Sequence, residues 1–525
     1  MRFLALYLSL LAALQGFAVQ PAWGQGKRRN RGSDQAPLSI PVRNMPPMPP
    51  GQGKRVIPIR HRRFSSALGQ TKAPVGDAAA QTQFGPHAPT IQSTNFEGLG
   101  DTFPGFTVNF APPDTDGAVG RTQYVQLVNT GFVVFDKATQ AVVAGPTLTN
   151  NLWASLSGSD PCKTTNDGDG IVLYDHLADR WIITQFANAG STTGPYYECV
   201  AISQTADAAG QYFLYFFDFV NTNGTQRLFN DYPKVGVWPD AYYFSYNSFT
   251  AAGAPVGAIL CALDRTNMLN GAATLRGVAG PAGTPSDNPP NTPAGNKQVC
   301  FNIQDFGLLP SDLDGPTLPP TGSPNYFLEW FNQSNLGLWK FHVDFNTLTS
   351  STLNGVNWVS PAGPTASTIS PQLISVTAFT ATCNWFVTGN SVCVPQCTPA
   401  NCGVNGTNQQ LDSLADRVMH RLAYRNFGNH ESLVTNHSVA TSGTTGSGIR
   451  WYEIQNPNGT PSVVQTGTWT PDTSYRWMGS AAMDKFGNLA IGYSVSSASM
   501  NPAIRYAARL STDSPGTLGN ETTLI

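Results

Sequence analysis

The chain has 525 residues, of which 41% are hydrophobic and 12% charged, with 51 glycines, 40 prolines and a formal net charge of −2. Because soluble domains carry about 25% charged residues, this composition is more typical of a secreted, turn-rich β protein than of a cytosolic helical one. A net charge so close to zero gives no electrostatic basis for binding nucleic acid or an anionic membrane surface, so we expect neither partner.

The first residues have the pattern of a secretory signal peptide. Arg2 precedes a mostly apolar run at 3–19, and the small residues of 22–24 suit cleavage before Gln25. The apolar run is short for a membrane span, which needs about 20 apolar residues. We therefore predict a signal peptide at 1–24 and a secreted protein, extracellular or in the cell envelope, without a membrane span.

Residues 25–105 form a leader that is basic, rich in proline and glycine, and poor in apolar periodicity. Such a composition is typical of a disordered linker or pro-segment. A solvated tail is the simplest interpretation. The alternatives are a tether to an anionic surface and a processing site after Arg63, which depend on Lys27, Arg28, Arg29, Arg31 and the run from Arg60 to Arg63.

One motif recurs over residues 106–515. It consists of an apolar strand, a turn rich in Asp, Gly, Asn or Pro, and a second strand of apolar and aromatic residues, which is the pattern of a β-hairpin. Six copies begin at Asp116, Asp169, Asp231, Ser323, His420 and Arg476. With the strand candidates between them, each unit of about 50 to 80 residues supplies about four strands.

Recurrence at this period in an all-β sequence is typical of a β-propeller. We predict a single propeller over 106–515, with six blades as the leading expectation and five or seven as alternatives, followed by a C-terminal tail at 516–525. The main rival, a pair of β-sandwiches, does not predict one motif recurring over the whole length. Asp175, Asp240 and Asp484 fall in the hairpin turns, so we expect them to hold blades together rather than to catalyse.

The chain has eight cysteines, an even number that favours disulfides in an exported protein. Proximity in sequence suggests Cys162 with Cys199 and Cys261 with Cys300, and pairing of the remaining four among themselves, namely Cys383, Cys393, Cys397 and Cys402. A four-cysteine zinc site is the alternative for these four, although their spacing lacks a paired CxxC.

Three stretches carry a resemblance to a known group: "YRWMGSAAMDKFGNLAIGYSVSS", "LAYRNFGNHESLVTNHSV" and "PPDTDGAVG". They resemble uncharacterised secreted bacterial proteins with sialidase-like, Asp-box-type propeller repeats. The resemblance covers nearly everything after about residue 110 and implies a propeller fold, but it brings no activity. It assigns no residue to a sialidase arginine triad.

Acidic residues stand near the start of several repeats, where the inner strands of a propeller would bring them to the axial channel. Hydrolysis of a glycosidic bond needs two carboxyl groups, one protonated and one ionised, about 5 to 10 Å apart. The acids at these positions are Asp114, Asp116, Asp167, Asp169, Asp231, Asp312 and Asp314, with Glu431 in the turn of the fifth repeat. From this ring of acids we select Asp116, Asp231 and Glu431 as the catalytic candidates. The candidates for binding an anionic or cyclic sugar are Arg121, Arg476, Tyr475, Trp477 and His430.

The same acids have two other interpretations. Closely spaced aspartates could hold calcium through their oxygens, and the candidates for this are Asp167, Asp169, Asp312 and Asp314. No EF-hand loop is complete. Alternatively, the acids only cap strand ends and turns.

The sequence therefore leads to a secreted β-propeller directed at carbohydrate, either hydrolysing or binding a polysaccharide at the axial mouth, and acting as a monomer. If it is an enzyme, we expect a sialidase-like glycoside hydrolase. The alternative is a non-catalytic extracellular or cell-surface propeller that binds a protein. This choice rests on analogy between folds.

Overall fold

The computed structural model describes residues 35–49, 51, 55–56, 60, 77–81, 83–86, 96–219, 227–272, 298–358, 369–397, 410–441 and 446–524. The predicted signal peptide, Cys402 and the basic residues named for the leader, except Arg60, lie outside these ranges. Across the ranges, none of the helices has the length and apolar character that a membrane crossing requires.

Three antiparallel sheets of four strands follow one another along the first half of the described chain. The first contains β3 (Asp116–Val119), β4 (Gln123–Val128), β5 (Gly131–Asp136) and β6 (Val142–Leu148). The second contains β7 (Val172–Asp175), β8 (Arg180–Ala187), β9 (Tyr197–Ser203) and β10 (Tyr212–Asp218). The third contains β11 (Phe229–Val237), β12 (Ala241–Phe249), β13 (Pro255–Asp264) and β14 (Gln298–Ile303).

The later strands form one sheet of 14 strands built from three antiparallel runs. The first run is β15 (Leu309–Asp314), β16 (Asn325–Asn332), β17 (Asn335–His342), β18 (Thr352–Leu353), β19 (Val356–Asn357) and β20 (Gln372–Ser375). The second is β23 (Met419–Asn426), β24 (Glu431–Ala440), β25 (Ser447–Gln455) and β26 (Ser462–Trp469). The third is β27 (Tyr475–Met483), β28 (Leu489–Ser497), β29 (Met500–Arg509) and β30 (Thr522–Thr523).

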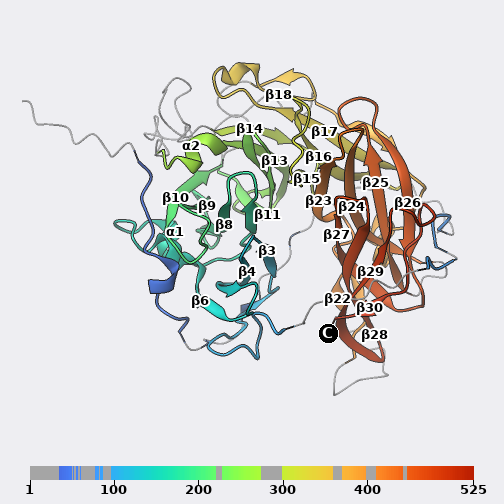
Figure 1. Ribbon diagram of the computed structural model, residues 1–525, viewed down its shortest axis with the longest axis horizontal. Coiled ribbons are helices and arrows are strands. Elements are labelled where there is room, and N and C mark those ends of the chain that lie inside the picture. Colours follow the sequence, from blue (N-terminus) through green and yellow to red (C-terminus); the bar gives the residue numbers. More distant parts are fainter. Residues whose placement is uncertain are drawn as a thin grey trace, which may run out of the picture.

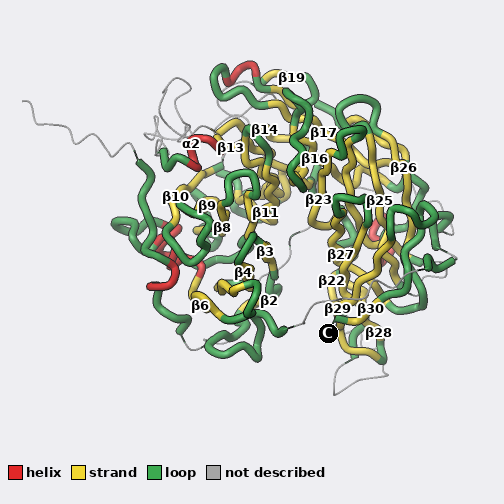
Figure 2. Tube along the Cα trace, viewed as in Figure 1, coloured by secondary structure: helices red, strands yellow, loops and turns green. Residues whose placement is uncertain are grey.

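The remaining elements are short. Two strand pairs join β1 (Arg55–Val56) to β2 (Phe110–Ala111) and β21 (Val392–Val394) to β22 (Leu411–Asp412). The helices are α1 (Pro161–Thr164), α2 (Arg265–Leu269) and α3 (Trp385–Thr388), with 3-10 turns at Val42–Asn44, Thr149–Trp153, Leu348–Ser350 and Thr382–Asn384. Strands and loops therefore account for nearly all of the described chain (Figure 2).

The chain is an all-β protein with the architecture of a β-propeller. Figure 1 shows β3, β11, β15, β23 and β27 toward the middle of the molecule and β6, β10, β14 and β26 at its periphery. Strands β15 and β23 pair in parallel, with Ser311 opposite Leu422, which joins two of the antiparallel runs into the larger sheet. Because this pairing merges separate runs of strands into one sheet, the sheets do not give the number of blades, and six blades stays a prediction.

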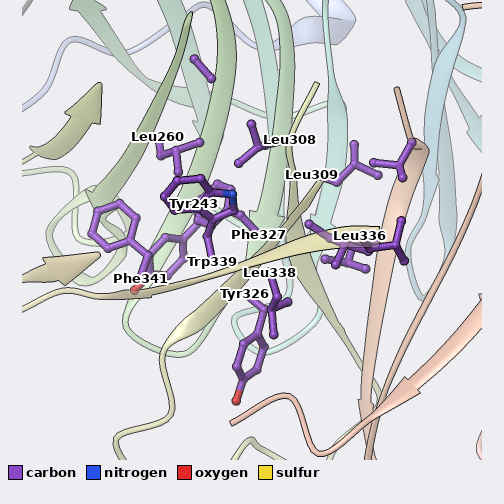
Figure 3. Close-up of a cluster of buried hydrophobic side chains, with 14 of the residues drawn as sticks. Tyr243, Leu260, Leu308, Leu309, Tyr326, Phe327, Leu336, Leu338, Trp339 and Phe341 are labelled. Atoms are coloured by element: carbon purple, nitrogen blue, oxygen red, sulfur yellow. The ribbon is translucent and has the colours of Figure 1, made fainter. Parts of the chain in front are cut away.

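The hydrophobic core lies between neighbouring sheets, and β12 shows why its residues form a central strand. All nine of its residues are buried. Successive side chains of a strand point to opposite faces, so Tyr242 and Phe244 pack toward the second sheet while Tyr243 packs toward β16 and β17. Figure 3 shows Tyr243 and Leu260 beside Phe327, Trp339 and Phe341 of the next unit.

The structural role predicted for Asp175 is confirmed by the hydrogen bonds of this residue in its hairpin turn. Its Oδ1 accepts hydrogen bonds from the backbone N–H groups of Leu177 and Ala178, at 3.0 and 3.1 Å. Its carboxylate also accepts from Tyr242 Oη of β12 at 2.8 Å and from Arg265 Nε, at the start of α2 directly after β13, at 2.7 Å. This buried aspartate closes its own turn and ties two sheets together.

The leader and the predicted tail are in part ordered against the propeller. Val42 is 1% exposed in a cluster with strands of the first two sheets, and the chain at Leu38 forms an antiparallel bridge to Phe213. At the other end of the chain, Thr522 and Thr523 pair with β29 as β30. The sequence expectation of a wholly disordered leader and a separate tail is therefore corrected for these residues, since their apolar and backbone groups find partners on outer strands.

The two predicted disulfides, Cys162–Cys199 and Cys261–Cys300, are confirmed, and within the group of four Cys383 pairs with Cys393. Cys397 is also disulfide-bonded, and the described residues include no free cysteine. The Cys383–Cys393 bond rules out the alternative of a four-cysteine zinc site. Disulfides on this scale each contribute about 3 kcal/mol by restricting the unfolded chain, and they are typical of an oxidising compartment.

Candidate functional site

Three acids from successive repeats meet near the first residues of the inner strands. Asp114 precedes β3, Asp169 precedes β7, and Asp231 is the third residue of β11. Each of these residues is partly exposed. Together with Tyr232, Lys234 and Arg417 they make up what we call the inner-strand cluster.

The carboxyl group of Asp114 donates a hydrogen bond to the carboxylate of Asp169. Asn129, which is fully buried, holds both residues: its Nδ2 donates to Asp114 Oδ2 at 2.6 Å, and its Oδ1 accepts from the Asp169 backbone N–H at 3.0 Å. Gly168 allows this approach, because a Cβ at its position would lie 2.7 Å from Asn129 Oδ1.

The backbone at the cluster is strained. Asp114, Asp169 and Tyr232 have φ angles of 38°, 48° and 55°, in the left-handed region that side chains other than glycine seldom adopt. Short polar aspartates tolerate it best. At Tyr232 the strain coincides with a shift of register between β11 and β12 after Asp231, a bulge that redirects the side chains. Strain of this kind is concentrated at functional sites.

The pKa values of the three carboxyl groups are raised to different degrees. Burial raises the pKa of Asp114 well above its usual range, and the charge of Asp169 adds to this shift. Burial also raises the pKa of Asp169, but the hydrogen bond from Asp114 opposes the rise. The pKa of Asp231 rises to about 7 through burial and the nearby charge of Asp169, while Arg60 and Arg417 oppose the shift. At neutral pH, Asp169 is therefore the member of the Asp114–Asp169 pair that ionises first.

Two cations of the cluster lie over the same aromatic ring. Lys234 Nζ is 3.6 Å and the Arg417 guanidinium 4.4 Å from the ring centre of Tyr232. Lys234 is 8% exposed, and burial lowers its pKa to about 8 against the opposing charges of Asp169, Asp116 and Asp114. Arg417 is neutralised by its neighbour Asp416, with Nε 2.7 Å from Oδ1. Both cations are thus held inside the protein.

Two further acids lie next to the cluster. Asp116 accepts a hydrogen bond from the Val172 N–H at 2.9 Å, and burial raises its pKa to about 6. Glu198 is fully buried on β9 and accepts from Asn230 Nδ2 at 3.1 Å. Burial raises the pKa of Glu198 to about 8, with the charge of Asp169 adding to the shift. Glu198 is therefore mostly protonated at neutral pH.

The structure separates Glu431 from Asp231. Glu431 pairs with Asn426 at the far end of β23, whereas Arg417 of the cluster precedes that strand. Eight strand residues at about 3.3 Å each place roughly 25 Å between the two ends. Glu431 accepts a hydrogen bond from Tyr424 Oη at 2.6 Å. The selection of Glu431 as a partner of Asp231 is therefore corrected.

Two of the residues proposed to bind a sugar, His430 and Arg121, also lie in turns away from the inner-strand cluster. His430 lies in the turn with Glu431 and stacks on Phe427, with ring centres 4.8 Å apart. Arg121 lies in the turn after β3, where its side chain is 73% exposed and its Nε is 3.8 Å from Asp179 Oδ2. Neither side chain is brought to the inner-strand cluster.

Arg476 and Trp477 are structural. The Arg476 side chain is 0% exposed and pairs with Asp472 and Glu521, both at 2.9 Å. Trp477 is 4% exposed in the interior. Tyr475 is partly exposed at the first residue of β27 and stays a candidate for ligand binding.

The acids expected to bind calcium have other partners. Arg421 Nη2 lies 2.7 Å from both Asp312 Oδ2 and Asp314 Oδ1. Asp167 Oδ2 accepts from the Ala189 N–H at 3.0 Å, and Asp169 accepts from Asp114. In the parts of the chain that the structure describes, His, Cys, Asp and Glu side chains do not gather in threes as metal ligands would. The four acids therefore do not form one calcium site.

Several residues of the cluster, and Asn129 beside it, are not selected by the sequence reasoning. Tyr232, Lys234, Arg417 and Asn129 are missed, and Asp114 is among the acids considered but is not chosen. Lys234 follows Asp231 by three positions, so a search for cations close to the repeat acids would have found it. Asn129 and Arg417 carry no such local signal, because they reach the cluster from a loop after β4 and a loop before β23.

No protein-family model and no curated protein matches the chain. Among solved structures the chain is similar to an endo-arabinase from Bacteroides thetaiotaomicron, with 14% identity over 66% of this chain and 96% of that chain and a TM-score of 0.28. A Trypanosoma rangeli sialidase in complex with sialic acid has 9% identity over 85% of this chain and 60% of that chain, with a TM-score of 0.34. The glycoside hydrolase family 43 YxiA protein from Bacillus licheniformis has 10% identity over 76% and 95%, with a TM-score of 0.28.

These solved structures are sialidases and glycoside hydrolases, but similarities at this level carry no argument about what the present chain does. The fold is established by its own sheets. The resemblance to sialidase-like repeat proteins rests on the motifs quoted for it.

Proposed function

We propose that this protein is secreted and acts on a polysaccharide at the axial mouth of the propeller, with the inner-strand cluster as a glycoside-hydrolysing site. One observation carries the proposal: Asp114, Asp169 and Asp231 converge from three repeats with pKa values that are set apart from one another. Pairs of acids whose surroundings separate their pKa values are typical of acid–base catalysis.

The roles follow from the protonation states. Asp231, with a pKa of about 7, retains a proton near neutrality and can transfer it to the leaving oxygen as the glycosidic bond breaks. Asp169 is the acid beside it that ionises first within its pair, and its carboxylate can activate the water that adds to the sugar carbon. Asp114 donates its hydrogen bond to Asp169 and so positions that carboxylate.

This assignment keeps Asp231 from the sequence analysis and replaces Glu431 by Asp169. Asp116 belongs to the same region, but its carboxylate is engaged by the Val172 N–H. We assign Asp116 to holding the first two inner strands together.

The proposal is tested with a panel of soluble oligosaccharides, using thermal melting for binding and release of reducing ends for hydrolysis. Binding to the native state raises the melting temperature by mass action. We expect one saccharide class to raise it in both the wild type and Asp231→Asn, and the wild type, but not Asp231→Asn, to release reducing ends. The matched control is Asp484→Asn, since Asp484 accepts hydrogen bonds in an exposed turn.

A melting temperature that no saccharide moves would overturn the proposal and favour the alternative, a propeller that binds a protein. A rise without release of reducing ends in any variant would leave a glycan-binding protein. Hydrolysis should weaken as the pH rises above about 7, because Asp231 then loses the proton it must donate.

A further inference from the structure

Described residues of the leader on either side of Arg60 in the sequence are anchored to the propeller. Residues 55–56 pair as β1 with β2, which ends three residues before Asp114. Farther along the leader, Ala80 forms a parallel bridge to Thr468 on β26, on the opposite side of the molecule from β6 and β10. Arg60 lies between these two anchored points of the chain.

Arg60 is seated among the residues of the cluster. Its guanidinium carbon lies 4.2 Å from the ring centre of Phe229 and 5.5 Å from that of Phe249. Its carbonyl oxygen accepts a hydrogen bond from Arg417 Nη2 at 3.4 Å. Its charge lowers the pKa values of Asp169 and Asp231. The guanidinium thus lies over two aromatic rings, an environment that favours a cation, and its charge acts on two acids.

The cluster has an excess of acid for this cation to offset. Arg417 is neutralised by Asp416, and Lys234 is opposed by Asp169, Asp116 and Asp114. Asp231 is the remaining acid of the cluster, and the charge of Arg60 acts on it and on Asp169. The fit of Arg60 is incomplete, however, because its Nη1 is buried without a hydrogen-bond partner. A buried donor without a partner is unfavourable, so a cationic ligand whose own donors are all satisfied can replace Arg60.

We propose that Asp169, Asp231, Phe229 and Phe249 form a recognition site for a cationic group, which Arg60 of the chain's own leader fills as a built-in competitor. Given the carbohydrate-directed function proposed above, on which this step rests, the ligand is a polysaccharide with free amino groups, as in glucosamine polymers. The protonated amine takes the place of the Arg60 guanidinium.

The experiment measures melting temperatures of the full chain against three probes: agmatine, a glucosamine tetramer and an N-acetylglucosamine tetramer. The variants are Arg60→Ala and Arg60→Gln, the latter keeping part of the stem against Phe229. The matched control is Arg43→Ala, because Arg43 is a leader arginine that pairs with Asp207. We expect agmatine and the glucosamine tetramer to bind Arg60→Ala and Arg60→Gln at least about tenfold more tightly than the wild type or Arg43→Ala. Adding Asp231→Asn to either Arg60 variant should remove this gain.

Agmatine tests the cation site without any sugar, so the two proposals fail separately. Equal affinity of the wild type and both Arg60 variants for agmatine overturns the competitor, and no agmatine binding to either variant overturns the cation site. If the neutral N-acetylated tetramer binds the variants as well as the free amine does, the cationic ligand is overturned while the carbohydrate function stands. Agmatine binding with no response to any saccharide would retain the cation site and overturn the carbohydrate function.

Discussion

Asp114 and Asp169 precede the inner strands of two different sheets, and yet the carboxyl group of one donates a hydrogen bond to that of the other. Burial raises the pKa of both side chains, and the hydrogen bond between them adds to the rise at Asp114 and opposes it at Asp169. Asn129 contacts both residues and is the group on which this arrangement depends most directly.

Replacing Asn129 with alanine should destabilise the protein and disturb the acid pair. The variant leaves the Asp169 N–H and the Asp114 carboxyl group without their buried partner, at a cost of about 1–3 kcal/mol each. Urea unfolding should show this loss, whereas Asn357→Ala, which removes an exposed side chain bonded to Thr349, should cost less than about 0.5 kcal/mol. Equal stability of the two variants would contradict the role assigned to Asn129.

Replacing Glu198 with glutamine should make the stability less dependent on pH. The pKa of Glu198 rises from 4.5 to about 8 on folding, so the folded state binds a proton that the unfolded state releases, and stability falls as the pH rises from about 4.5 to 8. At pH 7 this cost is on the order of 3 kcal/mol. The melting temperature of Glu198→Gln should match the wild type near pH 4.5 and exceed it by several degrees at pH 8.

The control for Glu198→Gln is Glu453→Gln. Glu453 is also buried, but its oxygens accept from Ser432 Oγ at 2.7 Å and from two glutamine side chains. Removing its charge should therefore lower the stability at pH 7 and at pH 8 instead of raising it. A Glu198→Gln variant that follows the wild type at pH 8 would contradict the raised pKa.

The hairpin turns, the inter-sheet core and the role of Asp175 could be predicted from the sequence because each depends on local chemistry. Alternating apolar residues determine which face of a strand is buried, and an aspartate in a turn accepts nearby N–H groups. The convergence of Asp114, Asp169 and Asp231 followed from recognising that the repeats are equivalent.

That reasoning failed where similar sequence motifs occupy different positions in a repeat. The "PSDLDG" segment looks like "PPDTDG", but Asp312 and Asp314 lie inside β15, in register with Ala423 and Arg425, and not before the strand. Contacts between residues far apart in the sequence could not be predicted either. Arg476 looked free to bind a ligand because its partner Glu521 lies 45 residues away, in a segment whose composition suggests a tail.

Calcium and EDTA should leave the melting temperature of the wild type unchanged, whereas each 1 kcal/mol of metal binding would shift it by about one degree in a chain of this length. The reason is that Arg421 already neutralises Asp312 and Asp314, two of the acids considered for calcium. Arg421→Gln removes that cation and should lower the stability by about 3–5 kcal/mol, because two inward carboxylates lose their partner. A fall of the wild-type melting temperature in EDTA would instead restore a structural metal ion.

Replacing Glu521 with glutamine should reveal how strongly the last residues hold the propeller together. Glu521 accepts hydrogen bonds from Arg476 Nε at 3.0 Å and from Tyr493 Oη at 2.7 Å, and the variant leaves the buried Arg476 without one of its two anionic partners. We expect a loss of about 3–5 kcal/mol near pH 7.

The pKa of Glu521 is lowered from 4.5 to about 2, so its contribution to stability is complete above about pH 4.5 and disappears as the pH falls through 2. Urea unfolding at pH 7 and at pH 2.5 should therefore show a large difference between variant and wild type in the first case and a much smaller one in the second. Glu97→Gln, an exposed acid bonded to Thr102, should change neither value, and a Glu521→Gln variant as stable as Glu97→Gln at pH 7 would return residues 516–525 to the role of a tail.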